Sequence, residues 1–190
     1  MTPDDATLHA DVVRALTRWT APGPAQDALR ADYLDHLARH ADGVWRACAP
    51  GHVTASAAVL DASGARILLT LHRKLKMWLQ LGGHLEPGDA TLTDAALREA
   101  TEESGIPGLR ADPSPVLLDR HAVPCHPGGS WHLDVQFAVF APPDAVPVIS
   151  DESDDLRWFP LDALPPDTDD SVRRLASAAR ERHTAPLAHD

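Results

Sequence analysis

The sequence predicts an α/β/α sandwich, in which helices cover both faces of a mixed β-sheet. Apolar runs between residues 52 and 71 are interrupted by a short turn, which is typical of paired strands. An amphipathic helix follows, and further strand-like runs lie beyond it. Strand-rich sequence on both sides of a helix favours helices packed on a mixed sheet.

An N-terminal helical extension is expected before this core. Apolar residues recur there at three- and four-residue spacing in two stretches, which is the pattern of an amphipathic helix. Pro22, Gly23 and Pro24 end the first stretch, and Gly43 interrupts the second. The two apolar stripes are Leu8, Val12, Leu16 and Trp19, and Leu29, Tyr33 and Leu37.

Paired strands and a closing helix complete the expected core. The segment from Val53 to Leu71 is predicted to form a hairpin, with its turn at residues 61–64. Apolar runs and then a helical stripe recur further along, which predicts two more strands and a final helix. These elements contain residues 117–118 and 135–140, on either side of a loop at Pro124–Gly129, and then Val172, Leu175 and Ala179.

Three glutamates on one helix face are the most informative group in the chain. Glu99, Glu102 and Glu103 stand at positions i, i+3 and i+4, so their side chains share one stripe before Gly105 ends the helix. Carboxylates at this spacing repel one another. Mg²⁺ takes such oxygen ligands and is commonly shared between carboxylates and substrate phosphates. Arg98 precedes Glu102 by four residues, within reach of an ion pair.

A longer pattern surrounds these glutamates. It contains a Gly, five residues, an acidic residue, Arg-Glu, an apolar residue, Glu-Glu, Gly and a final apolar residue, and it resembles the Nudix box of the Nudix hydrolase family. Two departures occur, because Asp89 stands where the box has Glu, and eight residues instead of seven separate it from Arg98. The matching positions are Gly83, Arg98, Glu99, Ala100, Glu102, Glu103, Gly105 and Ile106.

The resemblance implies a division of the chain. It covers about residues 50–183, the expected Nudix hydrolase domain with the Nudix-type α/β/α sandwich. Residues 1–49 precede this domain as the N-terminal helical extension, and residues 184–190 follow it as a C-terminal tail. The stretch from Leu156 to Leu164 resembles the strand and short turn before the last helix of many family members.

The resemblance also implies a metal site. By analogy with the family, Glu99 and Glu103 are direct Mg²⁺ ligands, Glu102 shares the ion, and the backbone carbonyl near Gly83 adds another oxygen. Mn²⁺ is expected to substitute for Mg²⁺. Arg98 is expected to orient Glu102 instead of touching the substrate. The insertion precedes the helix, so we expect a bulged loop that leaves metal binding intact.

The general base is expected in one of two places. Family members take it either from the box or from a later loop, which leaves Glu102 and Glu152 both open. Glu152 lies in an acidic stretch shortly before Trp158, where some relatives place such a residue. A solvated loop charge is the alternative explanation of Glu152.

Substrate contacts are expected from four residues. Arg73 lies in a short basic group before the box, and a guanidinium can hold phosphate oxygens in a bidentate manner. His132 and Asp134 would share one face of a strand and line the pocket, and His84 follows the metal loop directly. Solvation of a strand end by the basic group, and ordinary packing of the other three residues, are the alternatives.

A group of histidines with one cysteine raises the alternative of zinc binding. Imidazole and thiolate groups are the ligands that Zn²⁺ prefers in proteins. Their spacing nevertheless lacks the paired Cys-x-x-Cys or the helical His pair of specific zinc motifs. The group consists of His121, Cys125, His126, His132 and Asp134.

The functional prediction is a Mg²⁺-dependent Nudix hydrolase that cleaves a diphosphate linkage in a nucleoside diphosphate-X or nucleoside triphosphate. One alternative is a non-catalytic Nudix-like sensor of a nucleotide metabolite, which the altered position Asp89 keeps open. Another is an enzyme similar to isopentenyl-diphosphate isomerase, which relies on a cysteine and a glutamate in its pocket. Cys125 is the late-chain cysteine available for that role.

Composition restricts the partners and the compartment. A formal net charge of −11 argues against a nucleic-acid polymer as ligand, whereas metal ions can supply positive charge for a small phosphorylated substrate. Cys48 and Cys125 are too few for a disulfide framework, and we see no secretion signal or membrane-spanning run. We expect a cytoplasmic protein and, by resemblance to relatives that dimerise, a homodimer.

Overall fold

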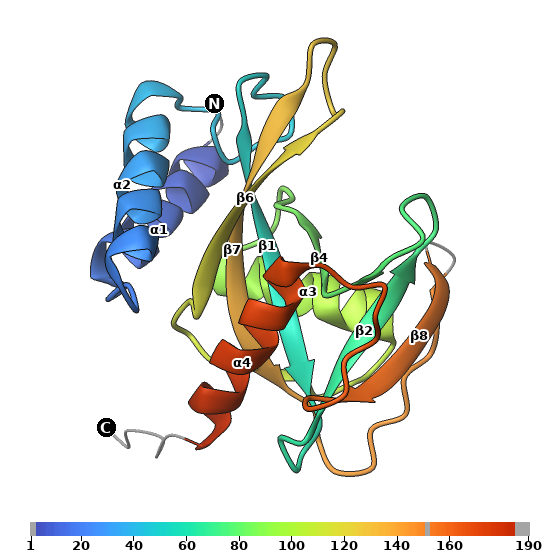
Figure 1. Cartoon of the computed structure of the whole chain (residues 1–190). Coiled ribbons are helices and arrows are strands. Elements are labelled where there is room, and N and C mark those ends of the chain that lie inside the picture. The colour runs from blue at the N-terminus through green and yellow to red at the C-terminus, as the bar shows by residue number, and fades with distance from the viewer. Residues whose placement is uncertain (1–2, 151–152, 185–190) are drawn as a thin grey trace.

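A mixed β-sheet with helices on both faces forms the centre of the computed structural model, which describes residues 3–150 and 153–184 (Figure 1). The predicted α/β/α sandwich is therefore confirmed. The described part of the chain contributes eight strands to one sheet, and parallel and antiparallel pairs both occur in it.

Strand β1 (His52–Leu60) is the centre of the sheet. It pairs in parallel with β7 (Ser130–Phe140) along its whole length, and antiparallel with β2 (Arg66–His72) and β4 (Leu81–His84). Every residue of β1 is buried, as expected for a strand covered on both faces. The other strands are β3 (Trp78–Leu79) and β8 (Ser153–Pro160) beside β2, and β5 (Arg110–Ala111) and β6 (Leu117–Val123) beside β7.

Different helices cover the two faces of the sheet. Helix α3 (Leu92–Ser104) packs on one face, where Ala57 of β1 lies in the same apolar cluster as Ala100. Helix α4 (Asp170–Thr184) packs on the opposite face, against Ala58 of β1. Neighbouring residues of β1 thus pack against helices on opposite faces of the sheet, because side chains alternate along a strand. The predicted stripe of α4 is buried at Val172, Leu175 and Ala179.

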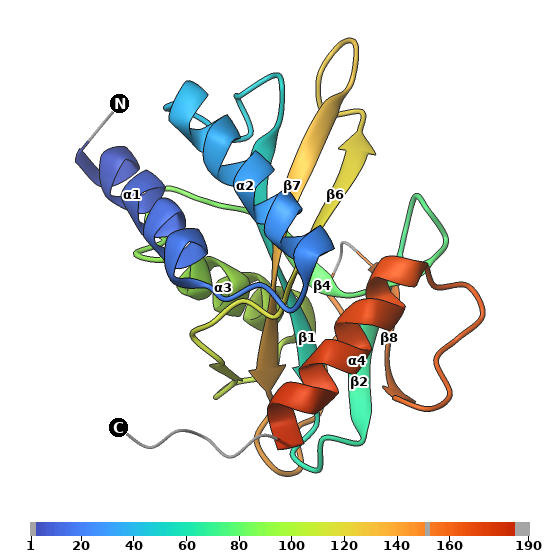
Figure 2. The ribbon, with the colours of Figure 1, turned by 60° about the vertical axis from the view of Figure 1, so that its left-hand side comes forward.

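The two predicted N-terminal helices are present as α1 (Pro3–Arg18) and α2 (Pro24–Arg39). They lie next to each other on the side of the sheet that carries α3 (Figure 2). Tyr33 Oη donates a hydrogen bond to the Asp119 carbonyl at 2.7 Å, which ties α2 to β6. No helix among the described residues is long and apolar enough to cross a membrane. The predicted stripes are buried at Leu8, Val12, Leu16, Trp19, Tyr33 and Leu37, and Leu29 is partly buried.

The predicted hairpin and the later loop are also confirmed. Strands β1 and β2 are joined by the expected turn, where Gly64 has a φ of 68°. Strand β6 ends at Val123 and β7 begins at Ser130, so the loop between them has the expected bounds. The parallel pairing of β1 with β7 was not predicted, and it places His52 directly beside His132.

Candidate active site

The glycine-rich strand β4 brings bare backbone against the glutamates of α3. A Cβ atom added to Gly83 would lie 2.6 Å from Glu99 Oε1, so a side chain at this position would force that carboxylate to shift. The Gly82 N–H donates a hydrogen bond to Glu103 Oε2 at 3.1 Å. Two of the three glutamates that were predicted to bind the metal, Glu99 and Glu103, are therefore held close to Gly83, where a backbone carbonyl was predicted as a further ligand.

Both ends of α3 are fixed. At its start the Thr91 side chain accepts a hydrogen bond from the Asp94 N–H, and Asp11 of α1 accepts one from the Leu92 N–H at 2.8 Å. At its end Gly105 adopts the left-handed conformation with φ 64°, and its N–H donates to the Thr101 carbonyl. The glutamates thus stand on a helix whose length is set at both termini.

Arg98 contacts three acidic side chains of the box, those of Asp89, Glu99 and Glu102. Its Nη1 lies 3.1 Å from Glu99 Oε1 and 3.1 Å from Glu102 Oε2, which confirms the ion pair that the spacing indicated. Its Nη2 donates to the His84 carbonyl at 2.9 Å. These carboxylates raise the pKa of Arg98 above its usual range, and the largest cause is the hydrogen bond that Arg98 donates to Asp89.

Asp89 is the main partner of Arg98, despite the insertion and the shorter side chain. Arg98 Nε donates to Asp89 Oδ1 at 2.9 Å, and Nη2 donates to Oδ2 at 3.1 Å. The Glu86 N–H also donates to Asp89 Oδ2 at 2.8 Å, which closes the loop. The Asp89 side chain is only 4% exposed. The loop therefore delivers a carboxylate to Arg98 in bidentate geometry.

The three box glutamates differ in exposure. Burial raises the pKa of Glu99, although the Arg98 guanidinium opposes this shift. The side chain of Glu102 is 61% exposed and remains open to solvent beyond its contact with Arg98. The site therefore combines a desolvated carboxylate with a solvent-facing one, and all of its side-chain donors are the oxygen atoms that Mg²⁺ prefers.

The predicted phosphate contact, Arg73, lies outside this helix. Arg73 follows β2, and its Nε lies 3.5 Å from Asp154 Oδ1. Lys76 of the same basic group lies 2.5 Å from the other oxygen of Asp154, so this acid balances the group. Glu152 falls outside the described residues. The roles of Arg73 and Glu152 stay predictions.

Asp134 lies inside the sheet. Its carboxylate accepts hydrogen bonds from Thr54 Oγ1 at 3.0 Å, Ser56 Oγ at 2.7 Å and Gln136 Nε2 at 3.1 Å. The residue is 3% exposed, and burial raises its pKa. The Asp134 carboxylate is therefore hydrogen-bonded to neighbouring side chains of the protein. Its contact with a substrate stays a prediction.

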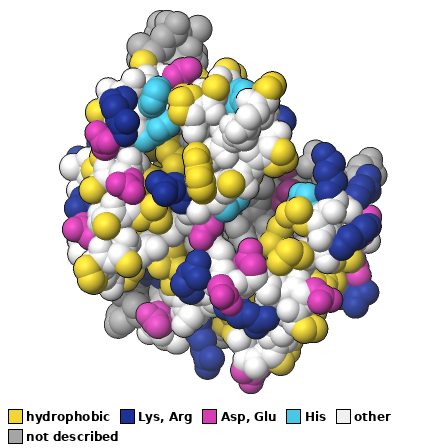
Figure 3. Space-filling view, turned by 45° about the horizontal axis from the view of Figure 1, so that its top comes forward, with side chains coloured by type: hydrophobic (Ala, Val, Ile, Leu, Met, Phe, Trp, Pro, Cys, Tyr) yellow, Lys and Arg dark blue, Asp and Glu magenta, His cyan; other side chains and the backbone are white. Residues whose placement is uncertain are grey.

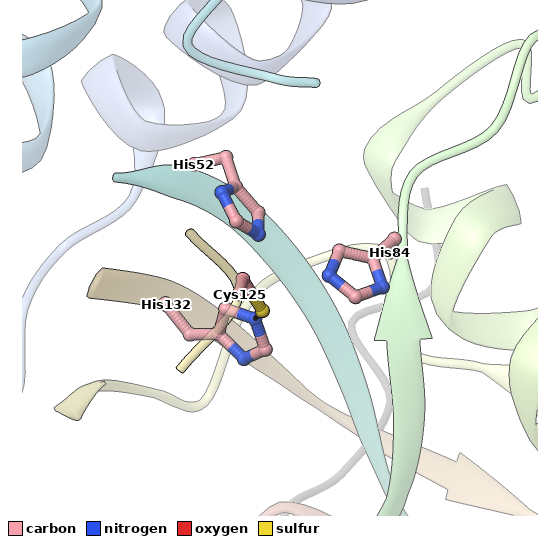
Figure 4. Close-up of side chains that lie close together, drawn as sticks. All are labelled: His52, His84, Cys125 and His132. Atoms are coloured by element: carbon pink, nitrogen blue, oxygen red, sulfur yellow. Dashed lines mark hydrogen bonds between the residues drawn. The ribbon is translucent and has the colours of Figure 1, made fainter. Parts of the chain in front are cut away.

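Four side chains of types that can bind a metal gather at one place in the structure. They come from β1, β4, β7 and the loop between β6 and β7, and they point toward one another (Figure 4). Their candidate ligand atoms all lie within 4.8 Å of one another. We call this group the His–Cys cluster; it consists of His52, His84, Cys125 and His132.

The His–Cys cluster differs from the group that the sequence suggested. Cys125 and His132 belong to both, but His121 pairs with Asp119 at 3.0 Å and His126 lies 2.7 Å from the Arg46 carbonyl. His84 and His52 take part instead. His52 was missed because only the unforeseen parallel pairing of β1 with β7 brings it next to His132.

The surface near these elements is hollowed and of mixed charge. On the face drawn in Figure 3, histidine side chains border a hollow, and acidic and basic side chains are interspersed around it. Such a face differs from the continuous positive surface that binds a nucleic-acid backbone.

Comparison with known proteins identifies the family. The family model described as "NUDIX domain" matches residues 50–179, which is more than half of the chain. The chain belongs to the Nudix family. The box, the mixed sheet and the flanking helices agree with this assignment, and the membership supports hydrolase activity. No curated protein matches the chain.

Solved Nudix structures have the same fold. A hydrolase of the Nudix family from Clostridium perfringens is 22% identical, with a TM-score of 0.55, and the match covers 70% of this chain and 97% of that one. The dihydroneopterin triphosphate pyrophosphohydrolase of E. coli is 20% identical, with a TM-score of 0.56, over 68% and 95% of the two chains. The Nudix domain of Shewanella oneidensis NrtR, complexed with ADP ribose, is 20% identical with a TM-score of 0.51, over 70% and 89%.

Proposed function

We propose that this Nudix protein is a Mg²⁺-dependent pyrophosphohydrolase that cleaves a diphosphate linkage in a nucleoside diphosphate-X or a nucleoside triphosphate. The single observation that carries the proposal is the arrangement around Gly83. Glu99 and Glu103 approach the bare backbone of β4, and Arg98 is bound to Asp89 behind them.

The donor set fits a hard divalent cation. Glu99 and Glu103, with a share from Glu102, would hold Mg²⁺ together with the backbone carbonyl near Gly83, and Mn²⁺ would substitute in the same oxygen set. The space that a Cβ of residue 83 would fill is the space next to Glu99. When bound, the cation neutralises charge that builds up on phosphoryl oxygens during hydrolysis.

Glu102 is the proposed base within the box. Its side chain is the exposed member of the three glutamates, so a substrate water can reach it. Arg98 acts as a positioning residue, because it contacts Glu102 and is itself anchored by Asp89. Glu152 remains the competing base. The pH–rate profiles of Glu102→Gln and Glu152→Gln distinguish the two candidates. Only removal of the true base should abolish the fall in rate at low pH that protonation of the base causes.

Arg73 is the proposed phosphate contact. Its side chain is more than half exposed, and Asp154 is the partner from which it would move to meet a substrate. An Arg at this place adds bidentate contacts to phosphate oxygens. Raised KM with little change in kcat in Arg73→Ala is the expected result for such a binding contact.

A nucleotide-derived small molecule is the proposed substrate class. Among proteins of the same fold, one is a pyrophosphohydrolase of a pterin triphosphate and another is complexed with ADP ribose. The net charge of −11 and the mixed surface charge favour a small metal-bound anion over a nucleic-acid polymer. The cytoplasmic location and the homodimer are also proposals; sedimentation of the purified chain tests the second.

A substrate panel tests this function. Nucleoside triphosphates, ADP-ribose, dinucleoside polyphosphates and sugar nucleotides would be assayed for product with Mg²⁺ or Mn²⁺, with and without a chelator. We expect metal-dependent release of phosphate, diphosphate or a nucleoside monophosphate. Tight binding of one compound without turnover would instead favour the sensor alternative. Isomerised isopentenyl diphosphate would favour the isomerase alternative.

A further inference from the structure

The His–Cys cluster has the composition of a transition-metal site. Three imidazoles and one thiol converge from four separate segments, and Cys125 Sγ lies 3.5 Å from His132 Nε2. Tetrahedral Zn²⁺ with bonds of about 2.0–2.1 Å to nitrogen and about 2.3 Å to sulfur separates these two ligand atoms by roughly 3.6 Å. One pair is therefore already at the required spacing. The other donors, all within 4.8 Å of one another, need to move closer, because two nitrogen ligands of tetrahedral Zn²⁺ lie roughly 3.3 Å apart.

His52 gives the strongest indication that a ligand belongs here. The residue is 0% exposed, and among the described residues neither of its ring nitrogens has a hydrogen-bond partner. The Cys48 backbone lies nearby but forms no hydrogen bond of normal geometry with the ring. His84 Nε2 is likewise buried without a partner in the described structure. Buried polar atoms without partners are costly and call for an explanation.

The rings are in the protonation state that a metal needs. Burial and neighbouring histidines lower the pKa of His52 to about 4 and that of His132 to about 3. Both rings are therefore neutral at physiological pH and offer lone pairs. The ring centroid of His52 lies 5.1 Å from that of His84 and 4.9 Å from that of His132, so the three rings pack together.

The geometry points to a Zn²⁺ site formed by His52, His84, His132 and Cys125, separate from the carboxylate site of the Nudix box. The ligand types distinguish the two, because imidazole and thiolate suit Zn²⁺ whereas carboxylates and carbonyls suit Mg²⁺. The ion joins the loop between β6 and β7 to β1 and β4. It also fixes His84, whose carbonyl accepts a hydrogen bond from Arg98, so the two sites share one residue.

The proposal changes the expected role of two histidines. His84 and His132 were expected to touch the substrate, whereas here their rings bind a cation. The two roles have different consequences. A metal ligand affects metal affinity and spectrum without any substrate present, whereas a substrate contact affects KM alone.

Cobalt substitution tests the site directly. The full-length chain, stripped with a chelator, would be titrated with Co²⁺ and then with Zn²⁺, and the bound metal counted by mass spectrometry. We expect about one Zn²⁺ per chain. The Co²⁺ form should show the intense visible bands of tetrahedral coordination and a near-ultraviolet thiolate charge-transfer band, both lost when Zn²⁺ displaces Co²⁺.

Variants assign the ligands. Cys125→Ser should remove the charge-transfer band and weaken Zn²⁺ binding at least about 100-fold, and His132→Ala should weaken it similarly. Cys125 lies in a loop and is only partly buried, so its substitution leaves the core intact. The matched control is His126→Ala, a neighbouring histidine outside the cluster, and Glu103→Gln shows that the Nudix box is not the zinc site. Both should bind Zn²⁺ as the parent does.

Several results would overturn the proposal. A Co²⁺ spectrum without a thiolate band would do so, as would equal Zn²⁺ affinity in the parent and in Cys125→Ser. Loss of zinc binding in Glu103→Gln would place the ion at the carboxylates instead. None of these results depends on catalytic activity, so the zinc site and the proposed hydrolase can fail independently. An increase in the thermal midpoint on adding Zn²⁺, absent in Cys125→Ser, is the second expected readout.

Discussion

Arg98 and Asp89 form the contact on which the geometry of the box depends. The Asp89 carboxylate is almost fully buried, and the Arg98 guanidinium reaches from it to Glu99 and Glu102. If the carboxylate is removed, the guanidinium keeps its contacts to the glutamates but loses the bidentate anchor behind them. We therefore propose that Asp89 acts through Arg98.

Asp89→Asn should destabilise the protein and slow turnover. Because Arg98 is partly exposed, we expect a loss of about 1–3 kcal/mol in the free energy of unfolding, less than for a fully buried pair. Urea unfolding measures this change. The matched control is Asp144→Asn, where an Asp already has a φ of 61° that Asn also tolerates. Equal stability of Asp89→Asn and the parent would show that the pair does not anchor Arg98.

At the residue scale, the sequence predicted the box but not the His–Cys cluster. Glu99, Glu102 and Glu103 are near neighbours in the chain, so helical periodicity alone places them together. His52 stands alone at the start of a strand, and no local spacing connects it to His132. Nor did the motif predict that Asp89 would still reach Arg98, because that depends on how the loop closes on Glu86.

At the scale of elements, the end of α3 controls where the last glutamates stand. Gly105 terminates the helix in the left-handed conformation, and an added Cβ would lie 2.9 Å from Val148 Cβ. Any other residue would be strained there by its backbone and by this contact. The position of Glu103 relative to Gly82 depends on the last helical turn.

Gly105→Ala should therefore lower the free energy of unfolding by about 1–2 kcal/mol and reduce activity. Gly23→Ala is the control, because its added Cβ meets nothing within 4 Å and its φ of 169° is extended backbone. The control should change stability by no more than about 0.5 kcal/mol. Thermal or urea unfolding of both variants measures these changes. Equal losses of stability in the two variants would contradict the conclusion that Gly105 is required at the end of α3.

The lowered pKa values of His52 on β1 and His132 on β7 predict how the free energy of unfolding depends on pH. In the metal-free protein, the pKa values of about 4 for His52 and about 3 for His132 lie below the ordinary 6.5. Between pH 6.5 and about 4 the unfolded chain thus binds protons that the folded chain does not, so stability falls as the pH falls through this window. The raised pKa of Asp134 and of Glu99 acts in the opposite direction.

Urea unfolding of the metal-free protein at about pH 7.5 and about pH 5 measures this loss. His132→Gln should lose less free energy of unfolding between these two pH values than the parent does. The variant lacks one of the two histidines whose protonation is suppressed in the folded state. His9→Gln, a histidine of α1 outside the cluster, should behave as the parent does. The pKa of His121 is raised by Asp119, so its protonation stabilises the folded state as the pH falls toward 6.5 and opposes the loss caused by His52 and His132. An unchanged slope in His132→Gln would contradict the assigned pKa.

The sequence predicted elements better than it predicted their pairing. Helical stripes such as that of Leu8 to Trp19 and the alternating apolar runs depend on neighbours in the chain, so they identified the main helices and strands. The parallel pairing of β1 with β7 joins segments that five further strands and helix α3 separate in the chain. Short strands such as β4 carry too few residues for a periodic signal.

At the scale of the whole molecule, the N-terminal helices share the core of the Nudix domain. Leu16 of α1 and Tyr33 of α2 lie in one apolar cluster with Phe137 of β7. Asp11 of α1 also accepts a hydrogen bond from the start of α3. The sequence indicated the helices but not this contact with the helix that carries the glutamates.

Leu16→Ala should therefore affect the entire fold. We expect a loss of about 2–5 kcal/mol in the free energy of unfolding, because the side chain is fully buried. Far-ultraviolet circular dichroism and tryptophan fluorescence should follow one shared transition. Leu75→Ala is the control, since Leu75 is 59% exposed. Two separate transitions in the parent would show that the N-terminal helices unfold independently.

The Mg²⁺-dependent rate of Glu103→Gln on the best substrate of the panel tests whether the glutamates of α3 bind the catalytic metal. Glu103 lies beside the backbone of Gly82, and its conversion to an amide removes one charge from the proposed cation site while preserving shape. We expect a rate about 100-fold or more below that of the parent, with Glu181→Gln on α4 as an unaffected control. Full activity of Glu103→Gln would contradict the claim that the glutamates of α3 bind the catalytic metal.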